Sequence, residues 1–220
     1  MVSSYEKGVI MKILTPEQKM AEAEKRIKEL LDSEDLKRLP EQIKDQIAQF
    51  YKQKSTNRME TASLIFSYSS DAKKKQSTEV SKEYADYGEV VAASYYAMYY
   101  IVHAYIAKKY AMKLREETRG VHAITHHLVL CYLVKTNQLA THLYEEYRKT
   151  METTAEIQKI FIDDFQKEAF GYAKKYEESR AARERFTYNV TRSAEEHHAK
   201  QAMAVAKEFI GTVRELMIKR

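Results

Sequence analysis

The chain has 220 residues and a formal net charge of +5, from 37 basic and 32 acidic side chains. Its five glycines and two prolines are too few for a turn-rich all-β fold and favour long helices with few corners. The single cysteine, Cys131, excludes an internal disulfide framework and a cysteine-based zinc site, and it lies in an apolar run typical of a core residue. The modest positive charge suits a nucleic-acid partner and an ordinary soluble protein equally well. Because the N-terminus has no signal-peptide pattern, we expect a cytoplasmic protein.

The first helices are predicted from their start signals. The sequence "TPEQ" places Thr15 at an N-cap and Gln18 at the closing position of a capping box, and the helix is expected to run to about Leu31. Pro40 opens the next segment, which carries apolar residues at helical spacing. The following "STNRMETASLIFSYSSD" is helical too, either fused to that segment or just after it. Residues 69–82 are polar and predict a loop.

The stretch from Val90 to Ala107 has no formal charge over eighteen residues. As a helix it would be ~27 Å long, nearly the thickness of a bilayer core. However, five tyrosines are spread through its middle, whereas membrane helices gather tyrosine at the interfaces. We therefore expect a buried bundle helix that lasts until about Leu114, and no membrane partner. The uncharged circumference further predicts that one side of the helix faces a partner subunit.

The second half of the chain predicts three more helical segments. A corner at Gly120 precedes the first, Asn137 interrupts it, and a long amphipathic helix is expected from Thr154 to about Arg185. A capping box that starts at Ser193 opens the last helix. Its apolar face comprises Ala199, Ala202, Met203, Ala206, Phe209, Ile210, Val213, Leu216 and Met217. Long helices with short connections predict an all-α, up-and-down bundle of four or five helices.

Metal-binding and enzyme motifs are sparse. His122 and His126 are one helical turn apart, and Glu195 and His198 have the i, i+3 spacing found in di-iron bundles. Such a site needs two of these pairs and two further carboxylates, so we favour solvent-facing or helix-end histidines and expect no metal and no cofactor. A ferritin-like metal carrier is the last of the alternatives. The sequence also has no glycine-rich phosphate loop and no nucleophile elbow.

The polar corner before the last helix is a candidate anion site. Arg183, Arg185 and Arg192 surround a break that contains Tyr188. Guanidinium groups beside a helix N-terminus can hold phosphate, and a tyrosine there could stack on a base. The alternative is that these arginines pair with neighbouring glutamates on a solvated helix surface.

Three segments together resemble the HEPN domain family. "AASYYAMYYIVHAYIAKK", from Ala92 to Lys109, resembles the family's second helix, usually worded "ASRxYYAMFHAAxALL". "RERFTYN", from Arg183 to Asn189, resembles the "RNxADYD" element, and "TRGVHAITHHLV" resembles the "THxGVxxLF" corner. The resemblance makes residues 55–220 a HEPN-like bundle, with an inserted or lengthened helix around residues 151–170. Residues 1–54 then form an N-terminal helical extension.

The resemblance implies a bundle that commonly dimerises around a polar cleft and has nucleotide- or RNA-related roles. Many members are paired with a minimal nucleotidyltransferase in toxin–antitoxin modules, and others are metal-independent ribonucleases with the pattern R-x(4–6)-H. Here the aligned Arg183 is followed by Tyr188 in place of the histidine, and a tyrosine with a pKa near ~10 cannot serve as a base at neutral pH. A second frame, Arg192 to His197, does fit the pattern.

The sequence thus predicts a homodimeric nucleotide- or RNA-binding component of a toxin–antitoxin or stress and defence module, with a nucleotidyltransferase partner. Arg183, Arg185, Arg192 and Tyr188 would bind the ligand, and His197 would be the acid or base of any catalysis. Two alternatives stay open. One is a purely structural module whose tyrosine-rich helix mates with a copy of itself or with another protein. The other is a metal-independent endoribonuclease that uses Arg192 and His197 as catalytic residues.

Overall fold

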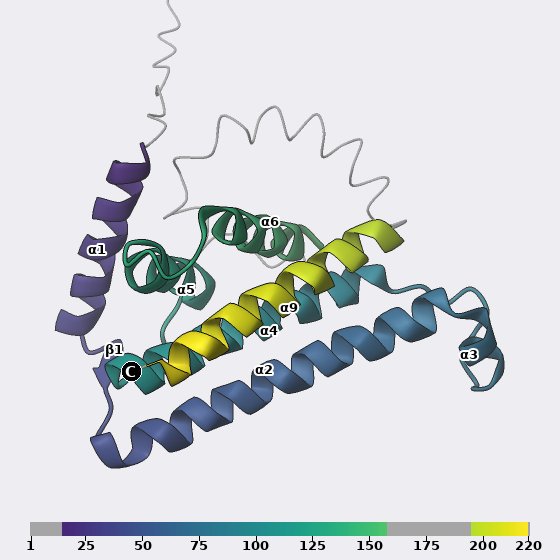
Figure 1. Ribbon diagram of the computed structural model, residues 1–220, viewed down its shortest axis with the longest axis horizontal. Coiled ribbons are helices and arrows are strands. Elements are labelled where there is room, and N and C mark those ends of the chain that lie inside the picture. The colour runs from purple at the N-terminus through teal and green to yellow at the C-terminus, as the bar shows by residue number, and fades with distance from the viewer. Residues whose placement is uncertain (1–14, 158–194, 220) are drawn as a thin grey trace, which may run out of the picture.

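The computed structural model describes residues 15–157 and 195–219, which form a helical bundle (Figure 1). The helices are α1 (Pro16–Asp32), α2 (Glu41–Ser70), α3 (Ala72–Gln76), α4 (Tyr87–Tyr110), α5 (Val121–Val129), the π-helical η1 (Leu130–Val134), α6 (Thr141–Ile157) and α9 (Glu196–Ile218). Two short strands, β1 (Leu36–Arg38) and β2 (Met112–Leu114), pair antiparallel. The predicted all-α bundle is confirmed.

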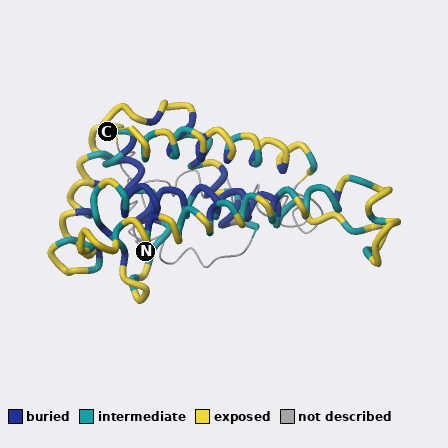
Figure 2. The backbone as a smooth tube through the Cα atoms, turned by 60° about the horizontal axis from the view of Figure 1, so that its bottom comes forward, coloured by how far each residue is buried: buried dark blue, intermediate teal, exposed yellow. Residues whose placement is uncertain are grey.

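Helix α4 is the centre of the bundle. In Figure 1, α9 lies over α4, α2 runs below them, and α5 and α6 lie above. Every residue from Val90 to Ala107 is buried except Tyr96, Tyr99 and Tyr100, and this burial appears as the dark core of Figure 2. By length and composition α4 is the one helix in the described ranges that could cross a membrane, but 83% of its apolar window is buried within the chain. The predicted buried bundle helix is therefore what the structure shows.

Helix α2 makes the most extensive contact with α4, and small side chains line this contact. Ala48, Ser55, Ala62 and Ser69 are the buried residues of α2, and they recur every seventh position, so all four lie on one face. Small side chains at a helix contact let the two backbones approach closely. At the centre of the contact the Ser55 hydroxyl donates a hydrogen bond of 2.7 Å to the backbone oxygen of Ala97. We call this row of small residues the α2–α4 seam.

The N-terminal helices share the core of the bundle. The capping box of α1 is present as predicted, with reciprocal hydrogen bonds between Thr15 and Gln18. The buried residues of α1 belong to the same hydrophobic cluster as those of α4, α5 and α9, and α1 packs on α5 and η1. The division expected between residues 54 and 55 falls inside α2, which continues through it without a break.

Cys131, expected to be a core residue, is only half-buried at the edge of this core, and burial raises the pKa of its thiol to about 11.

Some helix ends differ from those expected from the sequence because residues far away in the chain determine where the helix stops. α4 stops at Tyr110 and not near Leu114, because Ala111 adopts a left-handed conformation with φ 48° and the next residues pair with β1. Residues 72–76 form the short α3 inside the predicted loop. The predicted breaks at Gly120 and Asn137 are confirmed, and both residues have positive φ.

Two predicted helix starts in the second half of the chain are wrong. α6 runs unbroken through Thr154, where a new helix was expected to begin, and the rest of that predicted helix lies outside the described residues. α9 has Glu195 at its N-cap instead of Ser193, and Glu195 makes no side-chain capping bond. The predicted apolar face of α9 is confirmed at its buried members, which are Ala199, Ala202, Ala206, Phe209, Ile210 and Val213.

A layer of tyrosines and histidines is enclosed between α4, α5 and α6. The Nδ1 atom of His122 is 2.8 Å from the Tyr95 hydroxyl, and the Nε2 atom of His103 is 2.9 Å from the Thr125 hydroxyl. The Nε2 atom of His126 is 3.0 Å from the hydroxyl of a tyrosine on α6. The expectation that His122 and His126 face solvent is therefore wrong, whereas their expected place at helix ends is confirmed, since both lie in terminal turns of α5. These side chains join helices inside the protein.

Lengthening a side chain at the α2–α4 seam should destabilise the fold. Ala62 is fully buried, so we expect Ala62→Leu to push α2 away from α4 and to lower the free energy of unfolding by roughly 1–3 kcal/mol. The measurement is the urea midpoint followed by circular dichroism. Gln49→Leu adds a similar change on the exposed side of α2 and should leave the midpoint nearly unchanged. Equal midpoints for the two variants would contradict the close contact.

The buried histidine His103 should make stability depend on pH. Burial lowers its pKa from 6.5 to about 3, with His122 adding to the effect. Below pH ~6.5 the unfolded chain takes up a proton that the folded protein does not, so stability falls as the pH drops from ~6.5 towards 3, by about 1.4 kcal/mol per pH unit. At pH 5 the loss is about 2 kcal/mol from this group.

Urea midpoints of wild type and His103→Gln, measured between pH 7.5 and 5, check this. The glutamine can still bond to Thr125 but cannot titrate, so its midpoint should fall less steeply with pH. His197→Gln, at an exposed position, should follow the wild-type curve. Parallel curves for wild type and His103→Gln would refute the assignment.

Candidate functional site

The candidate residues taken from the sequence are only partly described. Arg183, Arg185, Tyr188 and Arg192 lie outside the described residues. His197 lies in the first turn of α9 and is exposed, with its Nδ1 atom 3.1 Å from a carboxylate oxygen of Glu195 and its ring next to that of His198. Of the predicted catalytic pair, the structure thus shows one exposed histidine at the start of a helix.

A different group of aromatic and basic side chains gathers on one side of α2 and α4. We call it the aromatic face, and it consists of Phe50, Tyr51, Lys54 and Arg58 from α2 and Tyr96, Tyr99 and Tyr100 from α4. At 100° per residue, both sets fall on one side of their helices, beside the seam. Phe50 is 52% exposed, and the other members are partly exposed. The face is thus open to solvent although it borders the core.

The rings of the aromatic face form a continuous row. Tyr51 and Tyr100 lie nearly parallel across the two helices, with ring centroids 6.3 Å apart and an interplanar angle of 21°. Phe50 extends the row on one side at 5.4 Å from Tyr51. Tyr99 and Tyr96 extend it along α4, with centroid distances of 5.2 Å from Tyr100 to Tyr99 and 6.3 Å from Tyr99 to Tyr96. The face therefore presents several neighbouring rings.

Two cations lie over these rings. The Lys54 ammonium is 4.6 Å from the Phe50 centroid and 5.2 Å from the Tyr100 centroid, and the guanidinium carbon of Arg58 is 5.5 Å from the Tyr96 centroid. These distances are typical of cation–π contacts. Within residues 15–157 and 195–219, neither cation forms an ion pair with a carboxylate. Their charge is thus available to an anionic ligand.

A buried layer lies beneath the face and affects three of its tyrosines. The Tyr99 ring is 4.5 Å from the ring of buried His103. Burial raises the pKa of Tyr51, an effect increased by Glu116 and Tyr100, and burial also raises the pKa of Tyr96 and Tyr99. Because these shifts favour the un-ionised phenol, the formal charge of the face comes from Lys54 and Arg58.

A basic hollow lies at the β1–β2 ribbon. It has a volume of about 330 Å³, and the ribbon register places Lys37 directly opposite Lys113 on the solvent side. Lys113 pairs with Glu116 at 3.3 Å, whereas Lys37 and the neighbouring Arg38 have no ion-pair partner in the described part of the chain. Glu116, which also lines the hollow, acts electrostatically on Tyr51 and helps to raise its pKa. The two surfaces combine stacking groups with unpaired positive charge.

No group of three or more histidine, cysteine, aspartate or glutamate side chains that could hold a metal ion occurs in the described ranges.

The aromatic face was not predicted, although part of its signal is in the sequence. Phe50, Lys54 and Arg58 follow one another at intervals of four residues, which places them on one side of a helix. What the sequence does not give is the register that sets them against the tyrosines of α4.

Comparison with known proteins adds no relative. No family model, no curated protein and no solved structure matches the chain. The HEPN resemblance therefore rests on the sequence motifs alone and stays a prediction, whereas the helical bundle is established by the structure.

Proposed function

We propose that the protein binds single-stranded RNA or nucleotides through the aromatic face. The observation that carries this proposal is the position of Lys54 and Arg58 over partly exposed rings. Bases stack on aromatic rings, and phosphates bind neighbouring cations, in proteins that hold single strands with little sequence preference. Each stacked base contributes about 1–3 kcal/mol in such proteins.

The shape of the site favours a single strand over a duplex. The rings form a row along two helices, and only unpaired bases expose the faces that such rings can stack on. The basic hollow at the β1–β2 ribbon offers further positive charge to phosphates, from Lys37 and Arg38. A strand that crosses both surfaces would use stacking at one end and phosphate contacts at the other.

The proposal also includes the oligomeric state, partner and cellular location that were expected from the sequence. A homodimer in a toxin–antitoxin or defence module, a nucleotidyltransferase partner and a cytoplasmic location all follow from the HEPN resemblance and the composition. The ligand residues proposed there, Arg183, Arg185, Tyr188 and Arg192, lie outside the described residues, and the aromatic face is independent of them. RNA binding through this face would thus hold whether or not those four residues contribute.

The contacts of the aromatic face also have a purely structural reading. Lys54 and Arg58 join α2 to the rings of α4, and an exposed cation–π contact stabilises a fold by about 0.5–1 kcal/mol. In that case the face would serve only the contact between α2 and α4. The structural module considered from the sequence is different, because there the tyrosine-rich helix mates with a copy of itself or with another protein. Binding that weakens with salt separates the two readings, because phosphate contacts depend steeply on ionic strength and helix packing does not.

Removing the two cations should weaken RNA binding. We expect Lys54→Gln/Arg58→Gln to lower the affinity for a fluorescein-labelled 12-nucleotide RNA of mixed sequence at least tenfold. The slope of log affinity against log salt should flatten by about 1.4, since each lost phosphate contact to a single strand accounts for about 0.7. Fluorescence anisotropy from 50 to 300 mM KCl gives both values.

Lys28→Gln/Lys73→Gln is the matched control, because it makes the same change in net charge at exposed positions on α1 and α3. It should bind like wild type. Tyr100→Leu keeps an apolar side chain but removes the ring, so it should lower affinity without changing the salt slope. Intact RNA after incubation in EDTA separates binding from the cleavage predicted for His197. No binding by wild type, or equal losses in the cation variant and its control, would refute the proposal.

A further inference from the structure

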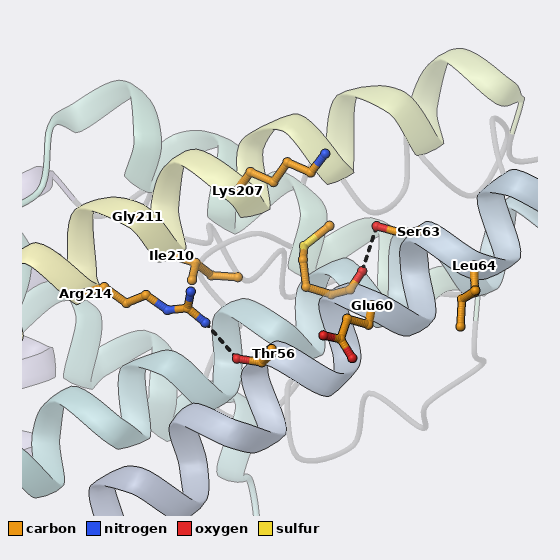
Figure 3. Close-up of a pocket in the computed structure, with 9 residues that line it drawn as sticks. Thr56, Glu60, Ser63, Leu64, Lys207, Ile210, Gly211 and Arg214 are labelled. Atoms are coloured by element: carbon orange, nitrogen blue, oxygen red, sulfur yellow. Dashed lines mark hydrogen bonds between the residues drawn. The ribbon is translucent and has the colours of Figure 1, made fainter.

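A second hollow is a groove between α2 and α9. It has a volume of about 580 Å³ and lies on the side of α2 away from the aromatic face, since Thr56 and Arg58 are two residues and therefore about 200° apart. Figure 3 shows its two walls, with Thr56, Glu60 and Leu64 on α2 and Lys207, Gly211 and Arg214 on α9. We propose that a second copy of this chain docks in this groove, related by a two-fold axis parallel to the helices.

The groove exposes apolar surface that has no cover in the described chain. Leu64 on its α2 wall is 61% exposed, and Met59 and Ile210 add apolar lining. At the other end Arg214 reaches across from α9, and its Nη2 donates a hydrogen bond of 2.8 Å to the Thr56 hydroxyl (Figure 3). The side chains of the two helices thus meet at one end of the groove and leave the rest open.

Gly211 has no packing reason within the described residues. It lies exposed in the middle of α9, and a methyl group added there would meet no atom within 4 Å. Gly88 differs, because an added methyl group would come within 3.1 Å of Ile157. A glycine inside a helix makes the helix less stable than an alanine at the same position would. Gly211 therefore destabilises α9 without a compensating contact among the described residues. Close approach of a second helix at Gly211 would supply the missing reason.

The charges at the groove favour a second copy over a foreign helix. Glu60 on the α2 wall and Lys207 on the α9 wall are both exposed, and neither has an ion-pair partner in the part of the chain that the structure describes. A two-fold axis parallel to the helices sets α2 of one chain against α9 of the other. Each Glu60 then faces the partner's Lys207, so the dimer contains two equivalent pairs of opposite charge. A foreign helix of uniform charge would instead be repelled by either Glu60 or Lys207.

This surface differs from the one expected from the sequence, where the uncharged helix from Val90 to Ala107 was to face the partner. That helix is α4, and its own chain already covers it except at Tyr96, Tyr99 and Tyr100. The groove is independent of these tyrosines. Dimerisation there and RNA binding on the aromatic face can therefore succeed or fail separately.

Charge reversals test the symmetric pairing. Sedimentation velocity should show wild type as a dimer at micromolar concentration. Glu60→Lys alone and Lys207→Glu alone should each raise the dissociation constant at least tenfold, because each sets like charges against each other. An equimolar mixture of the two variants should dimerise again, since one chain then offers two lysines and its partner two glutamates. The double variant Glu60→Lys/Lys207→Glu should also regain the dimer.

Two further variants complete the test. Glu208→Lys reverses a charge on the α6 side of α9 and should leave the dimer unchanged. Gly211→Leu should fold with the wild-type circular dichroism spectrum, because the space is open, and lose the dimer. A monomeric wild type would overturn the proposal. So would a dimer that resists the single reversals, a mixture that stays monomeric, or a Gly211→Leu protein that dimerises like wild type.

Discussion

The close contact between α2 and α4 is the constraint on which the rest of the structure depends. Four small residues at seven-residue intervals bring α2 against α4, and Ser55 ties the centre of the contact to the backbone of Ala97. This contact sets the register in which Tyr51 and Lys54 meet the tyrosines of α4. It also turns the opposite side of α2 towards α9. Both the aromatic face and the groove are consequences of one helix pairing.

Features that depend on neighbouring residues were predictable from the sequence. The burial of residues 90–107 follows from eighteen uncharged positions in a row, and the start of α1 follows from the Thr15 capping box. Features set by distant partners were not. The end of α4 depends on strand pairing between residues 36–38 and 112–114, which no local pattern announces. The contact of His122 with Tyr95 was not predictable for the same reason, because the tyrosine belongs to another helix.

The candidate site shows the same division. Within α2 and within α4, helical spacing alone predicts that the residues of the aromatic face lie on one side. The two helices are, however, 42 residues apart in sequence where Ser55 contacts Ala97. Only the fold shows that the cations of α2 lie over the rings of α4. The arginine corner, predicted from residue chemistry and family motifs, remains a separate hypothesis about residues 183–192. The two sites rest on different kinds of argument, one on motif order and one on geometry.

The central position of α4 has a consequence for how the molecule opens. α4 packs on α2, α5, α6 and α9, so exposing its backbone amides to solvent requires most of the bundle to come apart. Its amides should therefore be the slowest to exchange with deuterium, at a rate set by global unfolding. α3 contacts α2 and has no buried residues, so it can unfold and refold many times while the core stays closed. The protein thus combines a central helix that opens only on global unfolding with a short helix that unfolds locally.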